Sequence, residues 1–175
     1  MELKVVFTSA LDAFSLERFH RDVVPRLTKA NALNLYINSP GGQVPVALAL
    51  ARFVQMLKGR TTTYNMCRCD SAAIVLFAAG QERIVAKKGC SFRLHEVEKE
   101  LYGPQTIRML KRELGELRTD TWKICRFLEL QTGRTQLDWQ GDMLRQRVLT
   151  GLSARRMNLA TRIGDVSVKH VDVMI

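Results

Sequence analysis

The sequence predicts an α/β fold. Apolar, β-prone runs alternate along the chain with longer runs of helical character, and such alternation is typical of a layered α/β domain. The clearest pair is residues 33–37, a short run typical of a buried strand, and residues 44–57, an apolar run of helical length. With 175 residues, 46% of them hydrophobic, the chain is expected to form a single domain over residues 1–175.

The other elements follow from the same patterns. We predict strands over residues 4–8, 33–37, 61–66, 81–85 and 91–94, and helices over residues 15–29, 44–57, 71–79, 105–130, 137–145 and 153–157. Pro25 should interrupt the first helix, whose buried face would carry Phe14 and Phe19. Residues 96–101 alternate polar and apolar side chains and are expected to extend the preceding strand. Residues 148–150 are expected to form a turn.

Two short segments carry the candidate chemistry. Asn38-Ser39-Pro40-Gly41-Gly42 lies between a predicted strand and a predicted helix, and its glycines leave backbone N–H groups uncovered by side chains. Such a turn suits a developing oxyanion. Asp70-Ser71-Ala72 begins a helix of small residues, so Ser71 is a candidate nucleophile. The alternative for Ser71 alone is a helix N-cap.

These segments carry a resemblance to a known family. The stretch LYINSPGGQV, the segment from Ser71 to Gly80 ending in Ala-Ala-Gly, and Arg93-Leu94-His95 together resemble ClpP, the proteolytic subunit of Clp protease. The resemblance runs from about Val5 to Val166. It implies a ClpP/crotonase-like fold of repeated strand-strand-helix units, in which residues from about 96 to 131 form a protruding handle. It also implies homo-oligomeric stacked rings, peptide or unfolded protein substrates, and no cofactor or metal.

The resemblance also assigns roles to site residues. It makes Ser71 the nucleophile and His95 its base, and it places the oxyanion on the backbone N–H groups of Gly42 and Ala72. The other two histidines, His20 and His170, are expected at the surface.

One position departs from the family pattern. The family carries an aspartate before an Arg-Phe-Leu-Ser/Thr segment, and Gln146 stands there, ahead of Arg147. An amide oxygen can orient an imidazole but cannot stabilise the imidazolium, and in a serine protease this replacement lowers kcat by about 10⁴. Asp142, one helical turn earlier, is the candidate substitute, ahead of Asp138 and Asp165.

Several arrangements remain open at this point: a Ser71–His95 dyad, a triad completed by Asp142, a degenerate site, or Ser71 paired with a lysine such as Lys111. Two further departures argue against long extended substrates and a Clp ATPase partner. Glu98-Lys99-Glu100 replaces glycines that border the substrate strand, and few residues precede the first strand, where the family has axial loops. Asn158 replaces a glycine, which a left-handed backbone tolerates.

The sequence therefore predicts a ClpP-like serine peptidase subunit. The first alternative is a non-catalytic ClpP-like subunit with a structural or regulatory role in a ring. The second is a crotonase-type acyl-CoA enzyme, which the combination of serine and histidine disfavours.

Composition limits the partners. The net charge of +10 raises a nucleic-acid hypothesis, but glutamates interleave with the basic residues and no aromatic residues accompany them, so we expect no nucleic-acid partner. No apolar run approaches the about 20 residues that span a bilayer, and Met1-Glu2-Leu3-Lys4 is not typical of a signal peptide. We expect a cytoplasmic protein with no membrane partner.

Four cysteines, at positions 67, 69, 90 and 125, form no C-x-x-C motif. We expect reduced, buried thiols. Cys67 and Cys69 should share one face of a strand, where a metal site is a weaker alternative.

Overall fold

A parallel β-sheet forms the body of the molecule. The computed structural model describes residues 1–168 and 170–175. The sheet has the order β7-β4-β3-β2-β1-β8, and all neighbouring strands in it are parallel. Its strands are β1 (Glu2–Phe7), β2 (Ala32–Ser39), β3 (Arg60–Cys69), β4 (Glu82–Ala86), β7 (Arg162–Gly164) and β8 (Val173–Met174). The far end of β3 also pairs with β5 (Ser91–Arg93), and β5 pairs antiparallel with β6 (Val148–Thr150).

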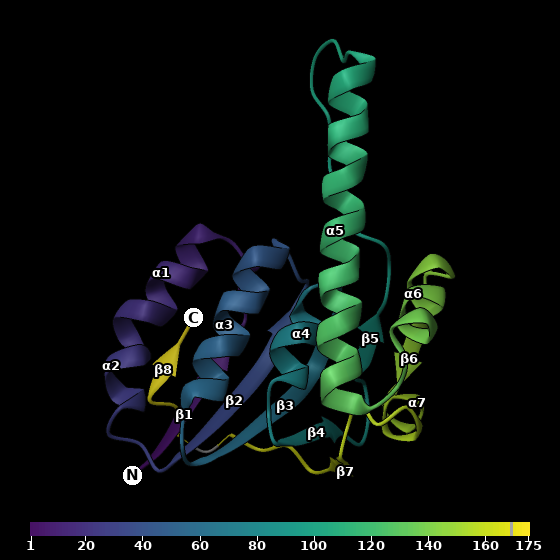
Figure 1. Cartoon of the computed structure of the whole chain (residues 1–175). Helices are drawn as coiled ribbons and strands as arrows, with labels where there is room; N and C mark the ends of the chain where they lie inside the picture. The colour runs from purple at the N-terminus through teal and green to yellow at the C-terminus, as the bar shows by residue number, and fades with distance from the viewer. Residues whose placement is uncertain (169) are drawn as a thin grey trace.

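Helices cover the sheet and extend beyond it (Figure 1). The helices are α1 (Ala13–Asp22), α2 (Val24–Leu27), α3 (Val44–Met56), α4 (Ala73–Ala78), α5 (Ile107–Thr132), α6 (Gln136–Leu144) and α7 (Gly151–Arg156). In the view of Figure 1, α3 lies in front of the strands, α1 and α2 lie at the left side of the molecule, and one end of α5 projects far from the body. No helix within residues 1–168 and 170–175 has both the length and the apolar character needed to cross a membrane.

The order of the strands brings the two motif segments together. β2 is buried along most of its length, as expected of a central parallel strand, and every residue of α4 is buried. The last pairing between β2 and β3 joins Ser39 to Cys69. The turns that follow these strands therefore leave the same edge of the sheet side by side, the usual place for a ligand site in an α/β sheet.

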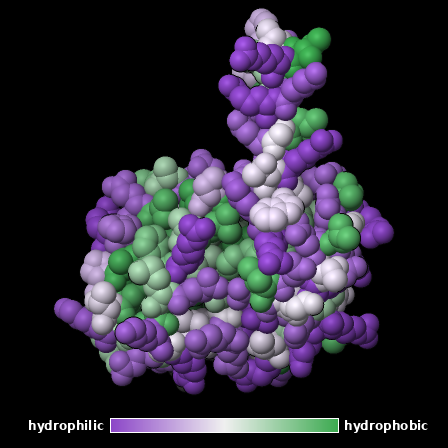
Figure 2. Space-filling model, in the orientation of Figure 1, coloured by the Kyte–Doolittle hydropathy of each residue, from purple (hydrophilic) through white to green (hydrophobic). Residues whose placement is uncertain are grey.

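Helix α5 has two different halves. Its carboxyl-terminal half packs on α4 and α6 through Ile124, Cys125 and Leu128, and Gly133 ends it with a left-handed φ of 75°. Its amino-terminal half projects, and the exposed apolar side chains of Ile107, Leu110 and Leu114 lie there. Figure 2 shows apolar residues along one edge of this projection.

Several predicted elements are confirmed. The strands over residues 33–37 and 61–66 and the helix over residues 44–57 lie within or close to β2, β3 and α3. Pro25 does interrupt the first helix, because α1 ends at Asp22 and a separate α2 follows. Asn158 has a φ of 59°, so it takes the left-handed conformation expected of a glycine substitute. The single-domain prediction over 1–175 stays a prediction, and residue 169 lies outside the described residues.

Other predictions are wrong. Phe14 is exposed, so it is not part of the buried face of α1. Residues 96–101 form no strand, because they run along α5 rather than beside a free sheet edge: Lys99 pairs with Glu113. Residues 148–150 are a strand, with Leu149 buried opposite Phe92, and the short β7 and β8 are not predicted at all. These strands have two or three residues each, and they form only because they pair with strands from distant parts of the sequence.

The cysteine prediction also needs correction. The pairing of β2 with β3 shifts between Ile37 and Ser39, and this irregularity breaks the alternation of side chains along the end of β3. Cys67 is exposed while Cys69 is buried. The two thiols are therefore in different environments, and no group of three metal-ligating side chains occurs in the described part of the chain.

Candidate active site

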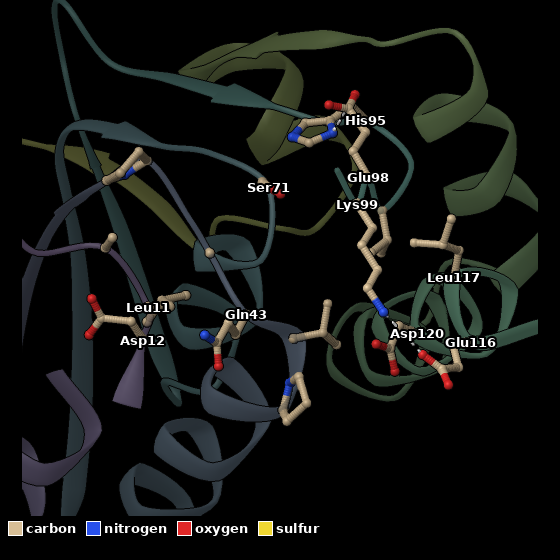
Figure 3. Close-up of a pocket in the computed structure, with 16 residues that line it drawn as sticks. Leu11, Asp12, Gln43, Ser71, His95, Glu98, Lys99, Glu116, Leu117 and Asp120 are labelled. Atoms are coloured by element: carbon tan, nitrogen blue, oxygen red, sulfur yellow. Dashed lines mark hydrogen bonds and ion pairs between the residues drawn. The ribbon is translucent and has the colours of Figure 1, made fainter. Parts of the chain in front are cut away.

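A cleft of about 610 Å³ opens beside the turns that follow β2 and β3 (Figure 3). Gly42, Ser71 and His95 all line it. The rest of its wall comes from the start of α1, the start of α3, the segment after His95, and α5. The side chains of Asp12, Glu98, Lys99, Glu116 and Asp120 make the charged part of this wall.

The Gly41-Gly42 turn has a backbone that requires glycine. Gly41 has a φ of 93° and Gly42 a φ of 144°, conformations that L-residues rarely adopt. A Cβ on Gly42 would lie 2.4 Å from the carbonyl oxygen of Leu11, and one on Gly41 would lie 2.6 Å from that of Asp70. The turn is held by Leu11, whose N–H donates to Gly41 O (2.8 Å) and whose O accepts from Gln43 N (2.7 Å).

Ser71 lies on a strained turn between β3 and α4. Its φ of 53° is left-handed, which is uncommon for a residue with a Cβ and frequent at catalytic nucleophiles on strand-to-helix turns. Two hydrogen bonds hold this turn to the end of β5: Ser71 N donates to Arg93 O (2.8 Å), and Arg93 N donates to Asp70 Oδ1 (3.0 Å). The nucleophile candidate is thus tied to the strand that leads to His95.

The oxyanion candidates are backbone N–H groups of the two turns that follow β2 and β3. Gly42 lines the cleft, whereas Ala72 is fully buried and follows Ser71 directly. Neither N–H donates to a protein acceptor among the hydrogen bonds of residues 1–168 and 170–175. Two backbone donors next to a serine hydroxyl are the elements of an oxyanion hole.

His95 contacts two oxygens through one ring nitrogen. Its Nδ1 lies 2.7 Å from the carbonyl oxygen of Glu96 and 3.3 Å from Oε1 of Glu98. Figure 3 shows the Glu98 carboxylate beside the imidazole ring, with Ser71 nearby. In the described part of the chain, no hydrogen bond joins Ser71 to His95, an arrangement common in catalytic pairs without substrate. The structure brings the two residues to one cleft without closing the bond between them.

Gln146 and Asp142 are placed differently from one another. Leu94 N donates to Arg147 O (2.8 Å), which brings the backbone around Gln146 next to His95. The Gln146 side chain lines a neighbouring cavity of about 410 Å³, together with Glu96 and Glu98. Asp142 is 1% exposed and forms ion pairs with Arg134 (2.5 Å) and Arg147 (2.9 Å). The structure therefore does not bring Asp142 to His95.

The remaining candidates lie away from the cleft. Asp138 accepts a hydrogen bond from Thr135 at the start of α6, and Asp165 forms an exposed ion pair with Lys87. Lys111 is exposed on α5 and is absent from the described lining of the cleft. His20 and His170 are exposed, as expected.

Lys99 is the one cation in the described cleft lining, and it is already paired. Its ammonium group contacts the carboxylates of Glu113 and Glu116. The hydrogen bond to Glu113 raises the pKa of Lys99 and lowers the pKa of Glu113, so both groups stay charged near neutral pH. Lys99 is therefore not available as a neutral base, and it does not form an ion pair with Glu98.

Sequence reasoning missed two partners of His95: the carbonyl of Glu96 and the carboxylate of Glu98. The expected strand over residues 96–101 concealed the second. In a strand, residues 95 and 98 would point to opposite faces, whereas the observed path returns Glu98 to the imidazole.

Comparison with known proteins shows which family this chain resembles. The model of the Clp protease family matches residues 23–167. The ATP-dependent Clp protease proteolytic subunit 4 of Rhodococcus jostii is 32% identical over 136 residues, which are 73% of this chain and 66% of that protein. The ATP-dependent Clp protease proteolytic subunit of Bdellovibrio bacteriovorus is 27% identical over 139 residues, which are 75% of this chain and 63% of that protein. The chain thus spans less than two thirds of the length of these curated relatives.

A solved structure has a similar fold. A mutant of ClpP1 from Listeria monocytogenes matches with a TM-score of 0.81 over 93% of this chain and 91% of that chain. Its sequence identity of 17% supports the fold alone, and the predicted ClpP-like fold is confirmed. Because the family model covers most of the chain, this protein belongs to the Clp protease family.

Proposed function

We propose that this protein is a serine peptidase subunit of the ClpP type. Ser71 would be the nucleophile, His95 the general base and acid, and the N–H groups of Gly42 and Ala72 the oxyanion hole. The observation that carries the proposal is the convergence of Gly42, Ser71 and His95 on one cleft, with Ser71 in a left-handed turn. A serine that served only as a helix N-cap would not need this backbone conformation.

The first half of the reaction forms an acyl-enzyme. Oγ of Ser71 attacks the peptide carbonyl carbon while Nε2 of His95 takes the hydroxyl proton. The carbonyl oxygen becomes an oxyanion that accepts hydrogen bonds from Gly42 N–H and Ala72 N–H. When the tetrahedral intermediate collapses, the C–N bond breaks and His95 delivers its proton to the leaving amine.

The second half releases the product. A water molecule gives a proton to Nε2 of His95 and attacks the ester carbon. The intermediate then collapses, the carboxylic acid leaves, and Ser71 recovers its proton from His95. His95 becomes an imidazolium once during acylation and once during deacylation. A nearby negative charge would therefore lower the energy barriers of both steps.

The resemblance to ClpP and the exposed apolar residues of α5 support assembly into stacked rings that act on peptides or unfolded proteins. Exposed apolar side chains recurring at positions 107, 110 and 114 lie on one side of the helix. A projecting helix with such a side is more stable when a second subunit covers it.

Labelling with a fluorophosphonate probe, followed by intact mass measurement, tests the catalytic proposal. We expect one adduct on the wild-type protein and none on Ser71→Gly or Ser71→Ala. The glycine variant matters because it removes the hydroxyl and also suits a φ of 53°. Ser167→Ala, at an exposed serine outside the cleft, is the matched control and should label like the wild type. An adduct that persists in Ser71→Gly would refute the assignment.

A second function has specific support. Gln146 stands where the family has an aspartate. This replacement favours a non-catalytic subunit that keeps the fold for assembly. A folded, oligomeric wild-type protein that forms no adduct would support this function over the peptidase.

A further inference from the structure

We propose that Glu98 positions His95 and supplies the negative charge that the residue at position 146 lacks. This inference rests on the proposed peptidase function. Glu98 would be a positioning residue, because it would act on the reaction through the imidazole of His95.

The contacts of His95 define which nitrogen carries the proton. Two oxygen acceptors face Nδ1, the carbonyl of Glu96 at 2.7 Å and the carboxylate of Glu98 at 3.3 Å. An unprotonated Nδ1 would place its lone pair against both oxygens, so the neutral ring carries its proton on Nδ1. Nε2 is then the free acceptor, which is the tautomer that a general base for Ser71 requires.

The other carboxylates considered as partners of His95 interact with different residues. Asp142 is buried between Arg134 and Arg147, Asp138 takes part in the cap of α6, and Asp165 pairs with Lys87. Within the described residues, the only ion pair of Glu98 is with His95. Its neighbour Lys99 is held by Glu113 and Glu116 and leaves the charge of Glu98 intact.

The backbone around Glu98 is anchored on both sides. Val97 packs against the hydrophobic core, and its N–H donates to Oγ1 of Thr121 on α5 (3.4 Å). On the other side, Lys99 is paired with α5. Because Val97 and Lys99 are both held to α5 or the core, Glu98 between them lies at the cleft (Figure 3).

The size of the effect follows from exposure. The Glu98 side chain is 75% exposed, and exposed ion pairs are weak and screened by salt. Removing the charge should therefore slow the reaction about fivefold, far less than loss of a buried triad aspartate does. The carbonyl of Glu96 would still hold the ring.

The test compares fluorophosphonate labelling rates of the full chain. We expect Glu98→Gln to label Ser71 about fivefold more slowly than the wild type. Added NaCl should slow the wild type towards the rate of Glu98→Gln and leave that variant unchanged. Glu17→Gln is the matched control: Glu17 is exposed on α1 and absent from the described lining of the cleft, so its loss should leave the rate unchanged. Equal rates and equal salt dependence in all three proteins would overturn the inference.

A double-mutant cycle and a spectroscopic measurement complete the test. Gln146→Asp should accelerate labelling more in the Glu98→Gln background than in the wild type, because both carboxylates would serve the same imidazole. Additive effects would count against the inference.

The ¹⁵N chemical shifts of the His95 ring report the tautomer without any need for activity. If the wild type forms no adduct but its Nδ1 resonance shifts in Glu98→Gln, with Nδ1 still protonated against the Glu96 carbonyl, the result would refute the peptidase and support the positioning. Unchanged shifts would overturn the positioning.

Discussion

Three backbone positions around the cleft have positive φ values, at Gly41, Gly42 and Ser71. The two glycines combine this conformation with a close approach to backbone atoms, so no side chain fits at either position. Ser71 carries a side chain despite the conformation, a strain of the order of 1–3 kcal/mol that persists only where the surrounding structure imposes it. At the residue scale, the site is therefore held by backbone geometry.

Gly42→Ala tests this geometry. The new Cβ would meet the carbonyl of Leu11, so the turn must shift and its N–H must leave the oxyanion position. We expect the labelling rate of Ser71 to fall about 10²- to 10³-fold, with the fold confirmed by circular dichroism. Gly115→Ala is the matched control, because nothing lies within 4 Å of a Cβ built at that helical position. It should label normally and raise the free energy of unfolding by about 0.5–1 kcal/mol.

Asp142→Asn tests whether the buried carboxylate is structural. The change removes the partner of two arginines and leaves their charges uncompensated, which should lower the free energy of unfolding by about 3 kcal/mol. Urea denaturation measures this loss. Asp165→Asn removes an exposed pair and should change stability by less than about 1 kcal/mol. If Asp142→Asn were as stable as the wild type but did not react with the probe, a catalytic role for Asp142 would have to be restored.

At the scale of elements, the packing of α5 on α6 holds the handle to the body. Cys125 is buried in this contact, with its Sγ 3.6 Å from Sδ of Met143. Burial raises the pKa of the Cys125 thiol to about 11. The packing therefore depends on an uncharged thiol.

The stability of this packing should fall in alkali. The unfolded thiol ionises near its ordinary pKa of 9.0, whereas the folded thiol stays neutral until about 11. The contribution of Cys125 is thus complete below pH 9 and is lost as the pH rises to 11, at about 1.4 kcal/mol per pH unit. Urea denaturation of Cys125→Ala should show a smaller decrease in the free energy of unfolding between pH 9 and 11 than the wild type. Cys67→Ala, which removes an exposed thiol, should keep the wild-type slope.

At the scale of the whole molecule, the handle carries apolar side chains that a single subunit leaves exposed. Ile107, Leu110 and Leu114 are 74%, 45% and 47% exposed on the projecting half of α5 (Figures 1 and 2). Apolar side chains on a projecting helix mark a surface that another subunit can cover. The body of the molecule encloses its own hydrophobic core.

Sedimentation velocity tests this surface. We expect the wild type to sediment as an oligomer and the double variant Leu110→Glu/Leu114→Glu to sediment as smaller species, because burying two carboxylates in an interface is unfavourable. Thr119→Glu lies on the opposite side of the same helix and should keep the wild-type assembly. A wild type that stays monomeric at micromolar concentration would contradict every ring-based version of the function.

Local patterns in the sequence were sufficient for the α/β class, for the main strands and helices, and for Gly42 and Ser71 as site candidates, whereas His95 was predicted from the resemblance to ClpP. Glycine turns, apolar runs and a serine before a helix of small residues are features of neighbouring residues, so they are visible without the fold. The preference of Asn158 for a left-handed backbone is of the same local kind.

Only the tertiary structure decided which carboxylate lies at His95. Asp142 is unavailable because Arg134 and Arg147 enclose it, and Glu98 is close because its segment leaves the sheet to run along α5. The strand at residues 148–150 and the separation of Cys67 from Cys69 also depend on pairing with distant strands. Such contacts join residues far apart in the chain, and their geometry depends on how whole elements pack, which no local pattern encodes.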